Sequence, residues 1–89
     1  MPEQPQAPGR ATWPALIGAL IRRESLTAAE AAWAMNEIME GAATPAQIAG
    51  FGVALRMKGE TVDELGGLAG AMLDHATPLH VPGRLADLV

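Results

Sequence analysis

The sequence predicts an all-α protein, a small bundle of four short helices with a disordered N-terminal tail and an extended C-terminal linker. Four segments repeat apolar residues at the 3.6-residue spacing of an amphipathic helix. Three of these segments are preceded by a threonine that is followed three residues later by Glu or Gln, which is the pattern of a capping box. Gly41 and Gly59 separate the later segments, and prolines and glycines gather near both ends of the chain.

The first helix is expected over residues 13–23, where Thr12 supplies the N-cap hydroxyl. Apolar side chains recur there at positions i, i+3, i+4, i+7 and i+8, which places them on one helix face. They are Trp13, Leu16, Ile17, Leu20 and Ile21. This helix is therefore strongly amphipathic.

The second helix is expected over residues 28–40. Thr27 and Glu30 form its capping box, in which the hydroxyl accepts from the N3 amide and the carboxylate accepts from the N-cap amide. Its apolar face consists of Ala28, Ala31, Ala32, Met35 and Met39. Gly41 follows the helix at a position where the backbone often turns left-handed, a conformation that costs glycine nothing.

The third helix is expected over residues 45–58, between a capping box of Thr44 and Gln47 and a terminating Gly59. One apolar stripe contains Ile48, Phe51, Gly52 and Leu55, and a second contains Ala49, Val53 and Met57. The helix is thus apolar around most of its circumference. A helix of this kind is normally buried on several sides.

The fourth helix is expected over residues 62–76, after a capping box of Thr61 and Glu64. Its predicted stripe is Val62, Leu65, Gly66, Ala69 and Leu73. Glycines are dense in the last two helices, and each interior glycine costs about 0.5–1 kcal/mol relative to alanine. We expect close approach of neighbouring helix backbones to offset that cost.

Composition excludes several classes of function. A chain of 89 residues forms one small domain of marginal stability. Its net charge is −4 and its basic residues do not cluster, which argues against nucleic acid and against an anionic membrane surface as partners. The chain has no cysteine, no apolar run of membrane-spanning length and no signal-peptide pattern. We therefore expect a cytoplasmic protein.

No residue receives a catalytic, cofactor-binding or metal-ligating role from the sequence. His75 and His80 lie on either side of a Thr-Pro break, so they cannot share a helical face as metal ligands. Glu30 is used as a cap, and Glu37 and Glu40 are interpreted as parts of a solvated helix face. His75 falls in the last turn of its helix, where a cation is favourable.

Three regions follow from these patterns: a disordered tail over residues 1–11, a helical bundle domain over residues 12–77, and a linker over residues 78–89. The linker ends on Leu85, Leu88 and Val89, apolar residues that no predicted element receives. We expect the chain to be a domain taken from a longer protein, with residues 78–89 leading into the next domain.

The predicted helices resemble the N-terminal helical domain of anthranilate phosphoribosyltransferase. The resemblance runs from about residue 13 to residue 79. It is most specific from Thr-Pro-Ala-Gln-Ile at residues 44–48 to Lys-Gly-Glu-Thr at residues 58–61. The segments 26–31 and 35–41, LTAAEA and MNEIMEG, are also similar to the family pattern.

The resemblance implies an enzyme that transfers 5-phosphoribosyl from phosphoribosyl pyrophosphate to anthranilate in tryptophan biosynthesis, with Mg²⁺ and usually as a homodimer. The family's Gly-Thr-Gly-Gly-Asp loop, which binds the diphosphate, belongs to an α/β catalytic domain that would begin about where this chain stops. The 89 residues alone are therefore expected to bind no cofactor and to be inactive. Phosphoribosyl pyrophosphate and anthranilate would be ligands of the full enzyme only.

Within that family the resemblance assigns the helical domain to dimerisation and to interdomain closure. The expected interface residues are Trp13, Leu16, Ile17, Leu20, Phe51 and Leu55, or their neighbours, with the choice between core and interface open for each. The expected hinge residues are Thr77, Pro78, Pro82 and Gly83.

Two alternatives remain open. The chain could be a free-standing helical interaction module, in which case the gene would end after Val89. It could also be the helical domain of a pyrimidine nucleoside phosphorylase, which shares this domain but looks less similar at residues 44–47. That enzyme would need a lysine- and serine-bearing phosphate loop downstream.

Overall fold

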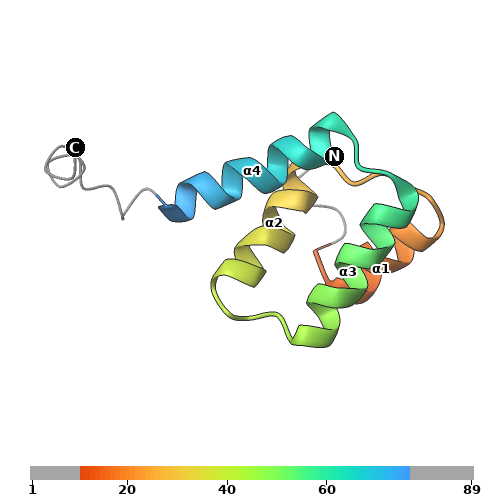
Figure 1. Cartoon of the computed structure of the whole chain (residues 1–89), viewed down its shortest axis with the longest axis horizontal. Coiled ribbons are helices and arrows are strands. Elements are labelled where there is room, and N and C mark those ends of the chain that lie inside the picture. The colour runs from red at the N-terminus through yellow and green to blue at the C-terminus, as the bar shows by residue number, and fades with distance from the viewer. Residues whose placement is uncertain (1–10, 77–89) are drawn as a thin grey trace, which may run out of the picture.

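The computed structural model describes residues 11–76, which form four α-helices and no strand (Figure 1). Helix α1 spans Trp13–Ile21, α2 spans Ala28–Met39, α3 spans Pro45–Lys58 and α4 spans Val62–Ala76. The predicted all-α bundle is confirmed over this range. The predicted tail up to residue 10, the linker over residues 78–89 and the hinge residues Thr77, Pro78, Pro82 and Gly83 lie outside the described residues.

Threonine side chains cap the helices as the sequence predicts. The Thr27 hydroxyl accepts from the Glu30 amide at 3.0 Å, and the Glu30 carboxylate accepts from the Thr27 amide at 2.8 Å. Thr44 and Gln47 make the same reciprocal pair at 3.1 and 3.0 Å. Thr12 accepts from the Ala15 amide at 3.3 Å. Each bond satisfies a backbone donor that the first helical turn leaves open.

Helix α1 ends two residues earlier than the sequence predicts. Arg23 adopts φ 66°, and its amide and the Glu24 amide donate to the Leu20 and Ala19 carbonyls at 2.9 and 2.8 Å. This pair of bonds is a Schellman motif, which closes a helix through a left-handed residue. The sequence shows no glycine there to signal the end. Helix α2 ends with the same motif, and there Gly41 occupies the left-handed position.

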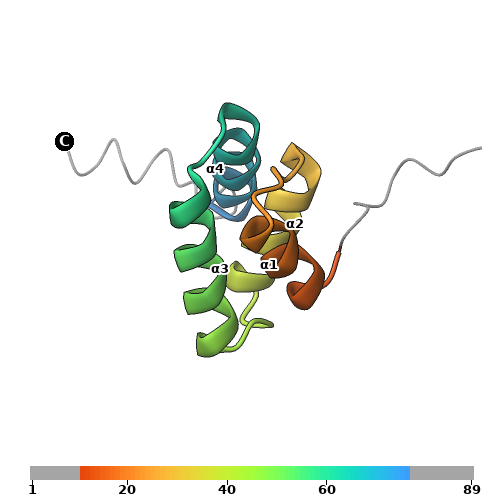
Figure 2. The same ribbon diagram turned by 90° about the vertical axis from the view of Figure 1, so that its right-hand side faces the viewer.

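The helices pack in two pairs, α1 against α3 and α2 against α4. Figure 2 shows α3 beside α1, with α2 behind α1. An aromatic cluster joins these three helices. The Trp13 ring centroid lies 5.3 Å from that of Trp33 and 5.4 Å from that of Phe51. The remaining buried members of this core are Leu16, Ala19, Leu20, Leu26, Ala34 and Leu55.

The packing of α4 differs from the prediction. Its buried residues are Glu64, Gly67 and Ala71, while the predicted stripe residues Val62, Leu65 and Leu73 are exposed. The cause is the approach of α2: a Cβ built at Gly67 would lie 2.1 Å from the Ala28 carbonyl oxygen. Only a glycine permits that contact, so the small residue rather than the apolar stripe sets the buried face.

The expected close approach at the other glycines of α3 and α4 is largely absent. A Cβ at Gly52, Gly66 or Gly70 would meet no heavy atom within 4 Å, and one at Gly50 would make an ordinary contact with Ile17. These four glycines therefore gain no backbone contact within the described residues. No helix in the same range has the length and apolar character needed to cross a membrane.

Candidate functional site

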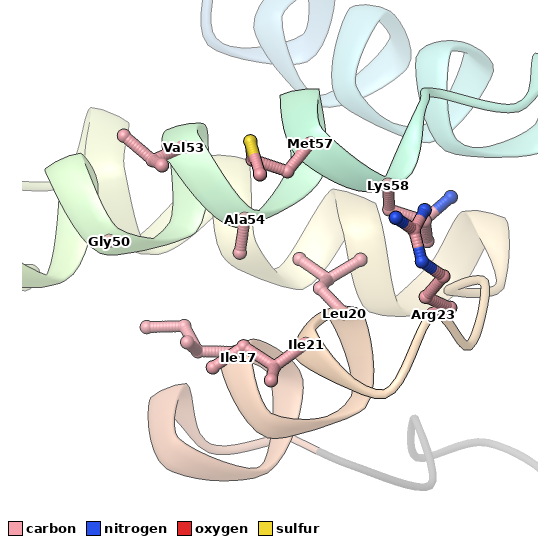
Figure 3. A pocket seen from close by; sticks show the side chains of 9 residues that line it. All are labelled: Ile17, Leu20, Ile21, Arg23, Gly50, Val53, Ala54, Met57 and Lys58. Carbon is pink, nitrogen blue, oxygen red and sulfur yellow. The ribbon is translucent and has the colours of Figure 1, made fainter.

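A groove of about 380 Å³ lies between α1 and α3 (Figure 3). Helix α1 and the turn after it form one wall, and α3 forms the other. The lining residues are Ile17, Leu20, Ile21, Arg23, Gly50, Val53, Ala54, Met57 and Lys58. Seven of them are apolar or glycine, and the two cationic residues lie together at one end of the groove.

Several apolar side chains that line the groove are largely exposed to solvent. Ile21 is 70% exposed, Val53 63% and Met57 71%. Because these residues lie on two helices around one depression, they form a contiguous apolar patch rather than scattered exposures. We call it the α1/α3 patch: Ile17, Ile21, Val53 and Met57.

The α1/α3 patch also explains the composition of α3. The helix was expected to be buried on several sides, but Phe51 and Leu55 are its only buried residues. Within the described chain, its second apolar stripe therefore faces solvent. No part of this copy of residues 11–76 buries this stripe.

Five of the six predicted interface residues lie in the core. Trp13, Leu16, Leu20, Phe51 and Leu55 are all at most 6% exposed. The sixth, Ile17, is half-buried and lines the groove. The exposed apolar surface beside them belongs to their sequence neighbours Ile21, Val53 and Met57. Periodicity identified the apolar faces of these two helices but did not divide core from surface, because both stripes of α3 are apolar.

A buried ion pair stands behind the cationic end of the groove. The Lys58 ammonium donates to Glu64 Oε1 at 3.0 Å and to the Gly59 carbonyl at 2.6 Å. Both side chains are almost completely buried, at 5% and 1% exposure. The positive charge of Lys58 is thereby balanced by the carboxylate of Glu64, so the pair adds little net charge to the groove.

Glu64 connects three parts of the fold. Besides Lys58 at the end of α3, its carboxylate accepts from the Thr61 amide at 2.8 Å and from the Leu26 amide at 2.7 Å. Burial raises the pKa of this carboxyl, but the hydrogen bonds from Leu26, Lys58 and Thr61 outweigh that effect and hold the pKa below its ordinary value of 4.5. The Thr61 and Glu64 capping box was predicted, whereas the contacts to Leu26 and Lys58 were not visible in the sequence.

His75 makes a second polar contact between helices. Its Nε2 lies 3.0 Å from Asn36 Oδ1 and 3.7 Å from Glu40 Oε2, so it joins the last turns of α4 and α2. The prediction of a helix-end role accounts for its position, and the partners on α2 are new. No group of three His, Cys, Asp or Glu side chains among residues 11–76 could hold a metal ion. These residues therefore do not fit a Mg²⁺ site.

Residues 14–76 match the family model described as the glycosyl transferase family, helical bundle domain. Similar curated proteins carry the name anthranilate phosphoribosyltransferase. The chain is 60% identical over 78 residues to one from Streptomyces griseus subsp. griseus, covering 88% of this chain and 22% of that protein. It is 60% identical over 84 residues to one from Arthrobacter sp., covering 94% and 24%.

A third relative of the same name, from Frankia alni, is 65% identical over 75 residues, covering 84% of this chain and 20% of that protein. The chain thus spans between a fifth and a quarter of the length of these curated relatives. The matched range contains all four helices except the first residue of α1. The chain belongs to the glycosyl transferase family through its helical bundle domain.

Proposed function

We propose that this chain is the N-terminal helical domain of an anthranilate phosphoribosyltransferase. The whole protein would transfer 5-phosphoribosyl from phosphoribosyl pyrophosphate to the amino group of anthranilate, a step of tryptophan biosynthesis. The observation that supports this best is the 60% identity over 88% of the chain to a protein of that name. The catalytic residues and a Mg²⁺ site would belong to the α/β domain beyond these residues, in a cytoplasmic enzyme.

An assay of the full-length protein tests this function. We expect it to consume anthranilate, followed by its fluorescence, only when phosphoribosyl pyrophosphate and Mg²⁺ are both present. The 89-residue chain alone serves as the control and should consume none. Phosphorolysis of a pyrimidine nucleoside by the full-length protein, without anthranilate turnover, would instead identify a nucleoside phosphorylase.

The helical domain itself would serve self-association and interdomain closure. Self-association is supported by the α1/α3 patch, because a homodimer would bury Ile21, Val53 and Met57 against a second copy of the same surface. The groove between the two helices provides a concave surface for such a contact. We therefore propose the α1/α3 patch as the dimer interface, with the buried residues Trp13, Leu16, Leu20, Phe51 and Leu55 supporting it from beneath.

Substitution of Met57 by glutamate tests this interface. Met57→Glu should make the 89-residue chain monomeric in sedimentation equilibrium, because the interface would then bury a carboxylate without a partner. Met72→Glu is the matched control, since Met72 is also exposed but lies on α4. Equal dissociation constants for Met57→Glu and Met72→Glu would place the contact elsewhere.

The role in closure rests on the resemblance and concerns residues beyond the described range. The hinge would lie at Thr77, Pro78, Pro82 and Gly83, and closure would exclude water from the reacting ribosyl centre. Gly83→Pro in the full-length enzyme should lower kcat by stiffening this connection. Unchanged kinetics would contradict the proposed hinge.

A further inference from the structure

Helix α4 carries a second apolar surface, on the side that faces away from α2. The helix lies at the edge of the bundle and packs on α2 through its buried residues Glu64, Gly67 and Ala71 (Figure 1). The opposite side is exposed and uncharged over the whole length of the helix. We call it the α4 stripe, and its members are Val62, Leu65, Gly66, Ala69, Gly70, Leu73 and Ala76.

Small residues occupy the middle of the α4 stripe, and large apolar residues flank them. Val62, Leu65 and Leu73 are each more than half exposed. A Cβ built at Gly66 or Gly70 would meet no heavy atom within 4 Å, so packing within residues 11–76 requires neither glycine. Each glycine nevertheless weakens the helix relative to alanine. Glycine on a helix surface lets a second helix approach closely and accept its side chains, so the stripe has the residue pattern of a helix–helix contact.

The size of the α4 stripe limits what can occupy it. A helix of 15 residues is about 22 Å long and one of its faces is about 10 Å wide, which gives a footprint of about 220 Å². Stable specific complexes bury about 800 Å² on each partner. A second copy of this chain, docked through α4 alone, would therefore bind too weakly to persist. A segment of the same polypeptide needs less area, because covalent attachment gives it an effective concentration in the millimolar range.

The relatives named above have the additional length that such a segment requires. The stretch they share with this chain is only a fifth to a quarter of their own length. Under the function proposed above, the remainder follows these residues in the same polypeptide. The described bundle ends at Ala76, the last residue of α4 and a member of the stripe. The continuing chain therefore starts beside the stripe and has only to turn back along α4 to cover it.

We propose that the α4 stripe is the docking surface for an apolar helix of the same polypeptide, from the part of the whole protein that follows residue 89. Large side chains of that helix would fill the spaces over Gly66 and Gly70, and Leu65 and Leu73 would pack beside them. The inference rests on the proposal that this chain is one domain of a longer protein. It does not depend on the α1/α3 dimer or on the reaction catalysed.

Thiol labelling measures whether the α4 stripe is covered. Leu65→Cys places a thiol on the stripe, and Ala42→Cys places a reference thiol at an exposed position between α2 and α3. The mass of the peptide that carries each thiol follows its reaction with a maleimide. The rate for Leu65→Cys relative to Ala42→Cys should be about tenfold or more lower in the full-length protein than in the 89-residue chain. An equal relative rate in both forms would overturn the proposal.

Substitution of Gly66 tests the close approach through a change of sign. In the 89-residue chain, Gly66→Ala should slow hydrogen exchange of the α4 amides, because the stripe is open and alanine favours the helix. In the full-length protein it should speed this exchange, because the added methyl group would displace the docked helix. Gly52→Ala, at an open position on α3, should slow the exchange of its own helix in both forms. Slower α4 exchange in both forms of Gly66→Ala would contradict the close approach.

Protein concentration identifies the occupant. The protection of Leu65→Cys in the full-length protein should not change on dilution, and the 89-residue chain should gain no protection as its concentration rises. Protection that appears in the concentrated 89-residue chain would assign the α4 stripe to a second copy and overturn the inference. A full-length protein that protects Leu65→Cys but does not consume anthranilate would contradict the proposed reaction and support the α4 contact.

Discussion

Glu64 shows how one side chain can connect three elements of a small domain. It is fully buried, and its carboxylate accepts hydrogen bonds from three donors: the Leu26 amide, the Thr61 amide and the Lys58 ammonium. Removing one partner of a buried pair leaves the other charge uncompensated, which costs about 3–5 kcal/mol. We expect Glu64→Gln to lower the free energy of unfolding by about 3 kcal/mol. Asp63→Asn, on the adjacent exposed residue, should change it by less than about 0.5–1 kcal/mol.

The same carboxylate predicts a pH dependence. Its pKa in the folded state lies below the ordinary value of 4.5, so the unfolded chain binds the proton more tightly. The stability that Glu64 provides is therefore complete above pH 4.5 and is lost as the pH falls through its lower folded-state pKa. Urea titrations between pH 7 and pH 3 should show a steeper loss of stability for wild type than for Glu64→Gln. Parallel curves would contradict this assignment.

Gly67 makes the closest backbone approach in the bundle. A methyl group there would overlap the Ala28 carbonyl, whereas Gly66, one residue earlier, faces open space. Gly67→Ala should destabilise the fold by about 1–3 kcal/mol through overpacking. Gly66→Ala should instead stabilise it by about 0.5–1 kcal/mol, the usual gain in helix propensity. If α2 and α4 pack as described, thermal or urea unfolding should show a lower free energy of unfolding for Gly67→Ala and a higher one for Gly66→Ala than for wild type.

At the scale of elements, the sequence predicts where helices begin better than where they end. Reciprocal capping boxes are local, so the sequence alone predicts the pairs Thr27 with Glu30 and Thr44 with Gln47. The end of α1 was not, because Arg23 takes a role that sequence patterns associate with glycine. The buried face of α4 was also misassigned, since its packing depends on the distant Ala28 and on the buried Glu64.

The face of α4 gives a further prediction. Leu65 belongs to the stripe expected to pack, but it is 52% exposed, while Leu68 is half-buried against the core. Leu65→Lys should leave the free energy of unfolding of this chain within about 0.5 kcal/mol. Leu68→Ala should lower it by about 1–2 kcal/mol, less than a fully buried leucine would. A large loss for Leu65→Lys would mean that the periodic stripe, and not the Gly67 face, packs on α2.

At the scale of the whole molecule, the sequence alone could not predict which apolar residues lie in the core and which form the α1/α3 patch. The cationic groove end and the Lys58–Glu64 pair bring together α3, the α1–α2 connection and the start of α4. These three segments are far apart in the sequence, so no local residue spacing predicts that they come into contact. The sequence did indicate an excess of apolar surface, since α3 is apolar on two sides, and the exposed Val53 and Met57 account for it.

Self-association through the α1/α3 patch would couple stability to concentration. A partner that binds only the folded state raises the apparent free energy of unfolding as its concentration exceeds the dissociation constant. The thermal midpoint of the 89-residue chain should therefore rise over a hundredfold increase in protein concentration. The midpoint of Met57→Glu should stay constant over the same range. A wild-type midpoint independent of concentration would contradict a dimer that dissociates on unfolding.

The positions of the two tryptophans determine which part of the fold their fluorescence reports. Both tryptophans of the chain lie where α1, α2 and α3 meet: Trp13 contacts the rings of Trp33 and Phe51. Helix α4 packs on α2 and contains no Trp, Tyr or Phe. Indole emission should therefore follow the opening of the three-helix junction, while far-ultraviolet circular dichroism counts every helical turn. Unfolding of α4 alone would reduce the dichroism and leave the emission unchanged, so a loss of dichroism that precedes the change in emission would identify α4 as the first element to unfold.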